Sequence, residues 1–172
     1  MASSACGSGS RSVSYNPTSG PQTTRPVLSW STMNANDGRH EVRFEGFTAD
    51  EILALPQDQV RGLVLTGEPL VFRIGSAAVL GEFRACGDRL IIELAQIEEG
   101  GEGVLLALGA LARRYATLHG LAAIEWIVHA VNCAKPNLKL RRVLQRRGFV
   151  IRQLEGVGEA YRYVDVVSAQ ME

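Results

Sequence analysis

The sequence predicts one α/β domain in which a mixed, mostly antiparallel sheet is flanked by helices. Three β-rich runs between Leu70 and Gln96 are separated by turn signals and predict an antiparallel meander. The period then changes, because the apolar residues from Val104 to Tyr115 fall on one helical face. The apolar, β-branched run from Ala123 to Val131 predicts a strand buried on both faces. A meander followed by a helix and a buried strand indicates this fold class.

The remaining elements follow from local signals. Thr48 and Glu51 have the spacing of a capping box, which predicts a short helix that Pro56 ends. Pro136 suits the first turn of a later helix, and Gly148 fits the position just after its end. The expected strands are residues 40–44, 70–74, 78–84, 90–96, 123–131, 149–154 and 160–167, and the expected helices are residues 48–55, 58–63, 104–118 and 136–147.

Length and composition predict a single core. The chain has 172 residues, of which 46% are hydrophobic, and this suits one domain rather than two. The stretch from Met1 to Pro26 is rich in Ser, Gly, Thr and Pro, so it cannot bury enough apolar surface to offset its ordering entropy. We therefore expect a disordered tail over residues 1–39, one domain over residues 40–168 and a short C-terminal tail over residues 169–172.

Charge and cysteine usage limit the partners that we expect. The formal net charge is zero, so the whole-molecule field favours neither nucleic acid nor membrane. Residues 135–147 are rich in Lys and Arg, which is compatible with a solvated helix face, a contact to phosphates or a binding surface for an acidic partner. This run contains no aromatic residue that could stack on bases, so we do not expect nucleic acid as a partner. The three cysteines are too few for a disulfide framework and lack zinc spacing, so we expect no metal and a reducing compartment. The chain also lacks a membrane-length apolar run and a secretory h-region, which predicts a cytoplasmic protein.

A glycine cluster precedes the helix that begins at Val104. Gly100, Gly101 and Gly103 let the backbone approach a ligand closely. Backbone N–H groups and the positive dipole end at a helix N-terminus suit phosphate oxygens. The same cluster is also compatible with an ordinary flexible connection.

This order of elements resembles the GNAT acyltransferases over nearly all of residues 40–167. The resemblance rests on Gly101-Glu102-Gly103-Val104-Leu105-Leu106 between a strand and a helix, and on Asn137 standing 11 residues before Gly148-Phe149. It implies a GNAT-like fold that binds acetyl-CoA or another acyl-CoA. By this resemblance, Gly101, Gly103 and Val104 would hold the pyrophosphate, and Asn137 would line the cleft beside the pantetheine arm.

Two positions depart from the family pattern. Where the family usually has Arg or Gln before the paired glycines, this chain has Glu98, followed by Glu99 and Glu102. These carboxylates would oppose a pyrophosphate by roughly 1 kcal/mol for each close contact. Where the family often has a Tyr that protonates the departing thiolate, this chain has Leu144.

Glu93 and His129 are the titratable residues nearest the expected cleft. Acyl transfer to an amine needs a base, and we place Glu93 first and His129 second. The alternatives are a solvent-facing strand carboxylate for Glu93 and a hydrogen-bonded core or edge histidine for His129. Cys133, about 13 Å from His129 along an extended chain, is better read as a small buried thiol than as a nucleophile.

Two functions remain open at this stage. The first is an N-acyltransferase that moves an acetyl or other acyl group from acyl-CoA to a primary amine. The second is a noncatalytic GNAT-like binding or regulatory module, of protein-interaction or toxin and immunity type, consistent with Glu98 and Leu144. The sequence identifies neither the acceptor nor the oligomeric state.

Overall fold

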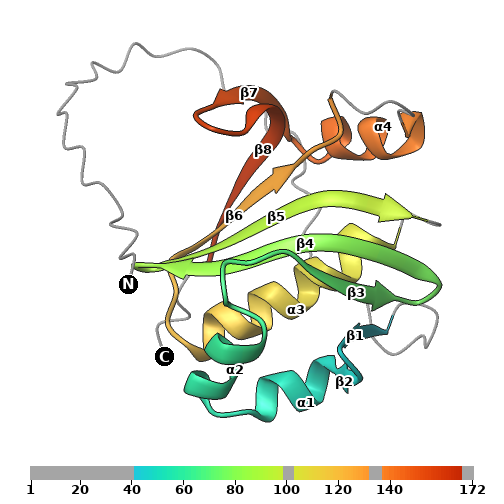
Figure 1. Cartoon of the computed structure of the whole chain (residues 1–172). Helices are drawn as coiled ribbons and strands as arrows, with labels where there is room; N and C mark the ends of the chain where they lie inside the picture. The colour runs from blue at the N-terminus through green and yellow to red at the C-terminus, as the bar shows by residue number, and fades with distance from the viewer. Residues whose placement is uncertain (1–40, 99–102, 132–136, 168–172) are drawn as a thin grey trace, which may run out of the picture.

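The computed structural model describes residues 41–98, 103–131 and 137–167 (Figure 1). The elements follow the order β1, β2, α1, α2, β3, β4, β5, α3, β6, α4, β7, β8. This order matches the one expected from the sequence except for β2, a two-residue strand that no sequence pattern indicated. The expected tails lie outside the described residues, as do Gly100, Gly101, Glu102, Cys133 and Pro136.

All strands of the described residues belong to one eight-stranded sheet with the order β2-β1-β3-β4-β5-β6-β8-β7. Among these eight strands, only β5 and β6 pair in parallel, and the remaining neighbours are antiparallel. The α/β class with a mixed, mostly antiparallel sheet is therefore confirmed. The strands are β1 (Val42–Phe44), β2 (Phe47–Thr48), β3 (Leu70–Ile74), β4 (Ala77–Cys86), β5 (Arg89–Glu98), β6 (Ala123–Val128), β7 (Val150–Leu154) and β8 (Gly158–Val166).

Three of the helices begin or end at a signal that the sequence carries. The capping box of Thr48 and Glu51 is present at the start of α1, with both reciprocal hydrogen bonds formed. Gly120 and Gly148 follow α3 and α4 with φ of 64° and 85°, a left-handed conformation that favours glycine. The helices are α1 (Ala49–Ala54), α2 (Gln57–Leu63), α3 (Val104–Leu118) and α4 (Leu138–Arg146).

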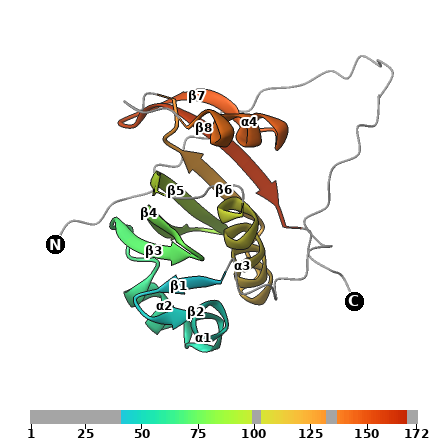
Figure 2. The same cartoon turned by 90° about the vertical axis from the view of Figure 1, so that its right-hand side faces the viewer.

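The core lies between the sheet and α3. Helix α3 packs along one face of the sheet, while α1 and α2 lie beside it near the β1 edge (Figure 2). On β5 the side chains that face this core are Leu90, Ile92 and Leu94, all at most 3% exposed. Three stacked or edge-on phenylalanine rings fill the core under β1, β3 and β4: Phe44, Phe72 and Phe83.

Three further features differ from expectation. Strand β6 ends at Val128 rather than at Val131, because the amide of Ala130 donates to the carbonyl of Val128 and turns the chain. Helix α4 begins at Leu138, directly after its cap Asn137, rather than at residue 136 as expected. Cys86 takes part in a disulfide, whereas we expected reduced cysteines.

None of the helices in the described ranges has the length and apolar character that a membrane crossing requires. Within the same ranges, no three side chains of the metal-binding types gather into a site for a metal ion.

Candidate functional site

Strands β5 and β6 run in parallel and then separate. Their register extends from Arg89 opposite Ala123 to Leu94 opposite Val128, and the amide of His129 adds one more bond, 2.9 Å, to the carbonyl of Leu94. Beyond this point β5 continues to Glu98, but the chain after His129 turns away. Figure 1 shows the tips of the two strands apart. Among the described residues, no strand pairs with the edge of residues 95–98 that faces β6.

A β-bulge marks the same position on the other side of β5. Leu80 pairs with Gln96 while Gly81 pairs with Leu94, so Ala95 is the extra residue. Gly81 is required here, because a Cβ at this position would lie 2.9 Å from the carbonyl oxygen of Glu93. The extra residue lies two positions after Glu93, and a bulge of this kind locally bends its strand.

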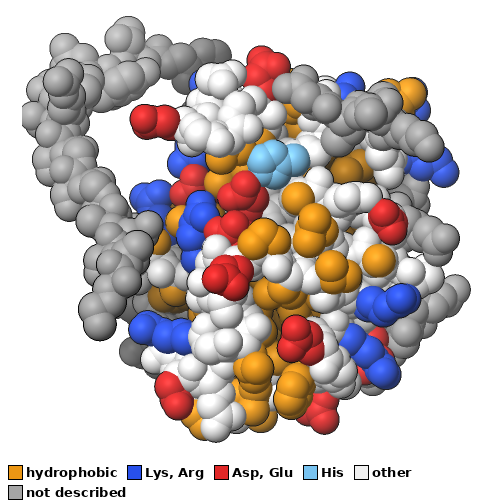
Figure 3. Space-filling model, viewed as in Figure 1, with side chains coloured by type: hydrophobic (Ala, Val, Ile, Leu, Met, Phe, Trp, Pro, Cys, Tyr) orange, Lys and Arg blue, Asp and Glu red, His pale blue; other side chains and the backbone are white. Residues whose placement is uncertain are grey.

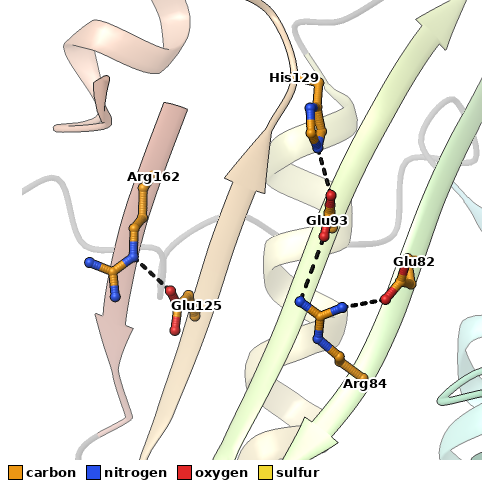
Figure 4. A network of polar contacts seen from close by, with 6 residues as sticks. All are labelled: Glu82, Arg84, Glu93, Glu125, His129 and Arg162. Atoms are coloured by element: carbon orange, nitrogen blue, oxygen red, sulfur yellow. Dashed lines mark hydrogen bonds and ion pairs between the residues drawn. The ribbon is translucent and has the colours of Figure 1, made fainter. Parts of the chain in front are cut away.

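Glu93 and His129 meet where β5 and β6 separate. The Oε1 atom of Glu93 lies 2.6 Å from Nε2 of His129, and their side chains are 17% and 29% exposed (Figure 4). The other carboxylate oxygen of Glu93 lies 3.7 Å from a guanidinium nitrogen of Arg84, which also bonds to Glu82. The two residues that the sequence placed separately in the cleft therefore form one hydrogen-bonded pair, part of a chain of four side chains.

Arg84 and Glu82 were not predicted from the sequence as site residues. Both alternate with the buried Phe83 on β4, so they point to the sheet face opposite α3. Glu82 pairs with Glu93 across the β4–β5 ladder. The alternation of charged and apolar residues at positions 82–84 was the signal that could have found them.

A second ionic cluster lies on the same face, nearer the start of β6. The carboxylate of Glu125 lies 2.6 Å from Nε of Arg162 and 3.7 Å from a guanidinium nitrogen of Arg89. Figure 4 shows Glu125 and Arg162 facing each other from β6 and β8, apart from the Glu93 cluster. This cluster ties β5, β6 and β8 together.

The face that carries both clusters is open over β4 and β5. Figure 3 shows charged side chains on this face beside a patch of apolar ones. Val71 is 62% exposed and pairs across the ladder with the half-buried Leu80, which neighbours Gln96 on β5. A ligand at Glu93 and His129 would thus meet an apolar surface on one side.

Helix α3 starts at Val104, six residues after β5 ends at Glu98. Gly103 occupies the cap position, and no side chain of the described residues caps the helix. The side chain of Val104 is 2% exposed and packs in the core, and a contact between its backbone and a cofactor stays a prediction. Glu98 is exposed at the end of β5, and its carboxylate accepts a hydrogen bond of 2.6 Å from the side-chain amide of Gln96. Gly101 lies outside the described residues.

Helix α4 is attached to the chain just after His129. Arg141 donates from Nε to the carbonyl of Ala130 at 2.7 Å, and its second nitrogen donates to the carbonyl of Val131. The side-chain oxygen of Asn137 accepts from the amide of Leu140 at 3.0 Å, so it serves as the helix cap. A contact between Asn137 and a cofactor stays a prediction.

Leu144 lies in the interior of the domain. Its side chain is 0% exposed, and its carbonyl accepts from the amide of Phe149. A residue at this position therefore packs in the core, and Leu144 offers no proton for a leaving thiolate.

Comparison with known proteins finds sequence similarity over about half of this chain. No family model matches the chain. Over 86 residues it is 34% identical to the riboflavin biosynthesis protein RibBA of Bacillus mycoides (strain KBAB4) and to that of Bacillus cereus (strain B4264). Each match covers 47% of this chain and 22% of the relative, so the chain spans about a fifth of the length of these curated relatives.

Two solved structures are similar in arrangement. Ard1 from Thermoplasma volcanium aligns with a TM-score of 0.35 and 12% identity, over 76% of this chain and 99% of that one. A GNAT-family acetyltransferase from Listeria monocytogenes 4b F2365 aligns with a TM-score of 0.33 and 13% identity, over 63% and 70% of the two chains.

Proposed function

We propose that this protein is an N-acyltransferase that moves an acetyl or other acyl group from acyl-CoA to a primary amine. The observation that carries the proposal is the 2.6 Å contact between Glu93 and His129, placed where β5 and β6 separate. A carboxylate hydrogen-bonded to an imidazole is a pair that general-base catalysis commonly uses. It stands next to residues 95–98 of β5, whose edge toward β6 pairs with no strand of the described ranges and offers hydrogen-bonding groups to an extended ligand.

In the proposed reaction, the Glu93–His129 pair and the backbone of residues 95–98 have different roles. The amine attacks the thioester carbonyl, and the Glu93–His129 pair takes the amine proton, directly or through one water. Backbone N–H groups along residues 95–98 supply donors that polarise the carbonyl. The C–N bond forms as the C–S bond breaks, and the products are an amide and free CoA.

Acyl-CoA would be held by backbone groups more than by side chains. The N-terminus of α3 at Gly103 and Val104 has no side-chain cap among the described residues, and its first turn contains no acid, so its N–H groups suit a pyrophosphate. Gly101 and Asn137 complete the predicted set. When bound, the cofactor supplies the activated acyl group.

Calorimetry with CoA and acetyl-CoA tests the proposal. We expect binding, a rise in melting temperature by mass action, and loss of both in a Gly103→Leu variant. Gly62→Leu is the matched control, because a side chain at Gly62 meets open space in α2. Glu93→Gln should lower acyl transfer by about 100-fold while CoA binding persists. Absence of binding at about 1 mM CoA would reject the acyltransferase assignment.

A noncatalytic GNAT-like module is the second candidate. Buried Leu144 and the exposed carboxylate of Glu98 near the start of α3 favour it. In that case the open face around Glu93 would bind a basic partner or a small cationic ligand. Retained binding of such a ligand with no affinity for CoA would support this function.

A further inference from the structure

We propose that the outer edge of β7 is a self-association surface, on which a second copy of this chain adds its own β7 in antiparallel orientation. Strand β7 is the last strand of the sheet and pairs only with β8 (Figure 1). A five-residue strand with one unpaired side presents N–H and C=O groups that another strand can bond. In the described part of the chain, no other strand takes that side.

The side chains of β7 support an interface rather than a solvated edge. All residues from Val150 to Gln153 are exposed. Val150 and Ile151 are 48% and 47% exposed, and they point to opposite faces of the sheet. Exposed apolar residues on both faces of an edge strand are unusual, because natural edges carry devices that oppose pairing.

Features that oppose edge pairing, such as bulges, prolines, charges and short strands, are sparse on β7 and present at the other edge of the sheet. The β7–β8 ladder runs without a register shift, and the strand contains no proline and one charge, Arg152. The opposite edge of the sheet ends in β2, which is two residues long. A short edge strand offers little to a partner, so pairing is directed to β7.

The occupant that fits best is a second copy, because β7 is self-complementary in one register. A two-fold axis through Ile151 sets Ile151 against its own copy and Val150 against the aliphatic stem of Arg152. An axis through Arg152 would instead face two guanidinium groups. The formal net charge of zero removes the long-range repulsion that would otherwise keep two copies apart.

The strand edge is small, so the dimer is weak. Stable interfaces bury about 800 Å² on each partner, more than a five-residue strand supplies. We therefore expect a dissociation constant of about 100 µM by sedimentation velocity of the full chain. Ile151→Lys should raise this constant at least about tenfold, because two ammonium groups would face each other. Val166→Lys should leave it unchanged, since Val166 is 71% exposed but lies on β8.

Cysteine crosslinking tests the register. Directly opposed residues bring their Cα atoms within the distance that a disulfide spans. Ile151→Cys should thus form a crosslinked dimer under a mild oxidant, while Gln153→Cys and the parent chain should not. A wild-type chain that stays monomeric to about 1 mM would overturn the proposal. So would a dimer that Ile151→Lys leaves intact, or crosslinking that favours position 153 or neither position.

Discussion

Arg113 on α3 and Asp165 on β8 form a two-bond ion pair, with Nε to Oδ2 and NH2 to Oδ1 both at 2.6 Å. Asp165 is 6% exposed and is the one charged residue among the buried side chains of the described ranges. Parallel bonds between a guanidinium and a carboxylate fix both groups in orientation. The pair therefore joins the central helix to the strand that lies beyond β6 in the sheet.

Removal of Asp165 should destabilise the domain. Asp165→Ala leaves the Arg113 guanidinium, a third exposed, without this carboxylate, so we expect a loss of about 2–3 kcal/mol, below the cost for a fully buried pair. Urea denaturation measures this loss. Asp50→Ala is the control, because Asp50 pairs with Arg114 at the surface and should cost less than about 1 kcal/mol. Equal losses in both variants would contradict the assigned role.

Gly81 should be intolerant of any side chain. A Cβ there would lie 2.9 Å from the carbonyl of Glu93 and 3.0 Å from the side chain of Leu94, so Gly81→Ala should cost about 1–3 kcal/mol. Gly62→Ala, in α2, meets open space and should stabilise by about 0.5–1 kcal/mol. Thermal denaturation of both variants checks the contrast. An unchanged melting temperature for Gly81→Ala would show that β4 and β5 are not held this closely.

The capping box of α1 gives a pH dependence with a definite sign. Hydrogen bonds from the backbone and the side chain of Thr48 hold the pKa of Glu51 below its ordinary value of 4.5. A carboxyl whose folded-state pKa is depressed stabilises the fold above its unfolded pKa, and this contribution disappears as the pH falls through the folded pKa. The stability difference between the parent chain and Glu51→Gln should therefore be present at pH 7 and shrink below pH 4.5. A difference that grows on acidification would contradict the capping role.

The sequence predicted the elements well because their signals are local. Thr48 and Glu51, three residues apart, were sufficient for the capping box, and the change of period at Val104 located α3. The strand ends were less predictable. The end of β6 at Val128 depends on a turn and on the attachment of Arg141 to Ala130, a contact across 11 residues that no local pattern encodes.

The candidate site was predicted in part. Glu93 and His129 were chosen separately from their places near strand ends, but their contact depends on the parallel register of β5 and β6, which sequence periodicity does not give. Arg84 was missed because its role arises from the pairing of β4 with β5. Asn137 was placed beside the cofactor by resemblance alone, and in the structure its side chain caps α4.

Glu98→Gln separates the two proposed functions. Glu98 lies at the end of β5 with its exposed carboxylate bonded to Gln96, close in sequence to the start of α3. If the α3 N-terminus binds a pyrophosphate, removal of this negative charge should tighten CoA binding severalfold at low salt. The gain should shrink as added salt screens the repulsion. Glu68→Gln, another exposed acid just before β3, should have no such effect. Titration calorimetry at two salt concentrations measures both variants. A folded Glu98→Gln protein that still shows no affinity for CoA would leave the binding module as the function to pursue.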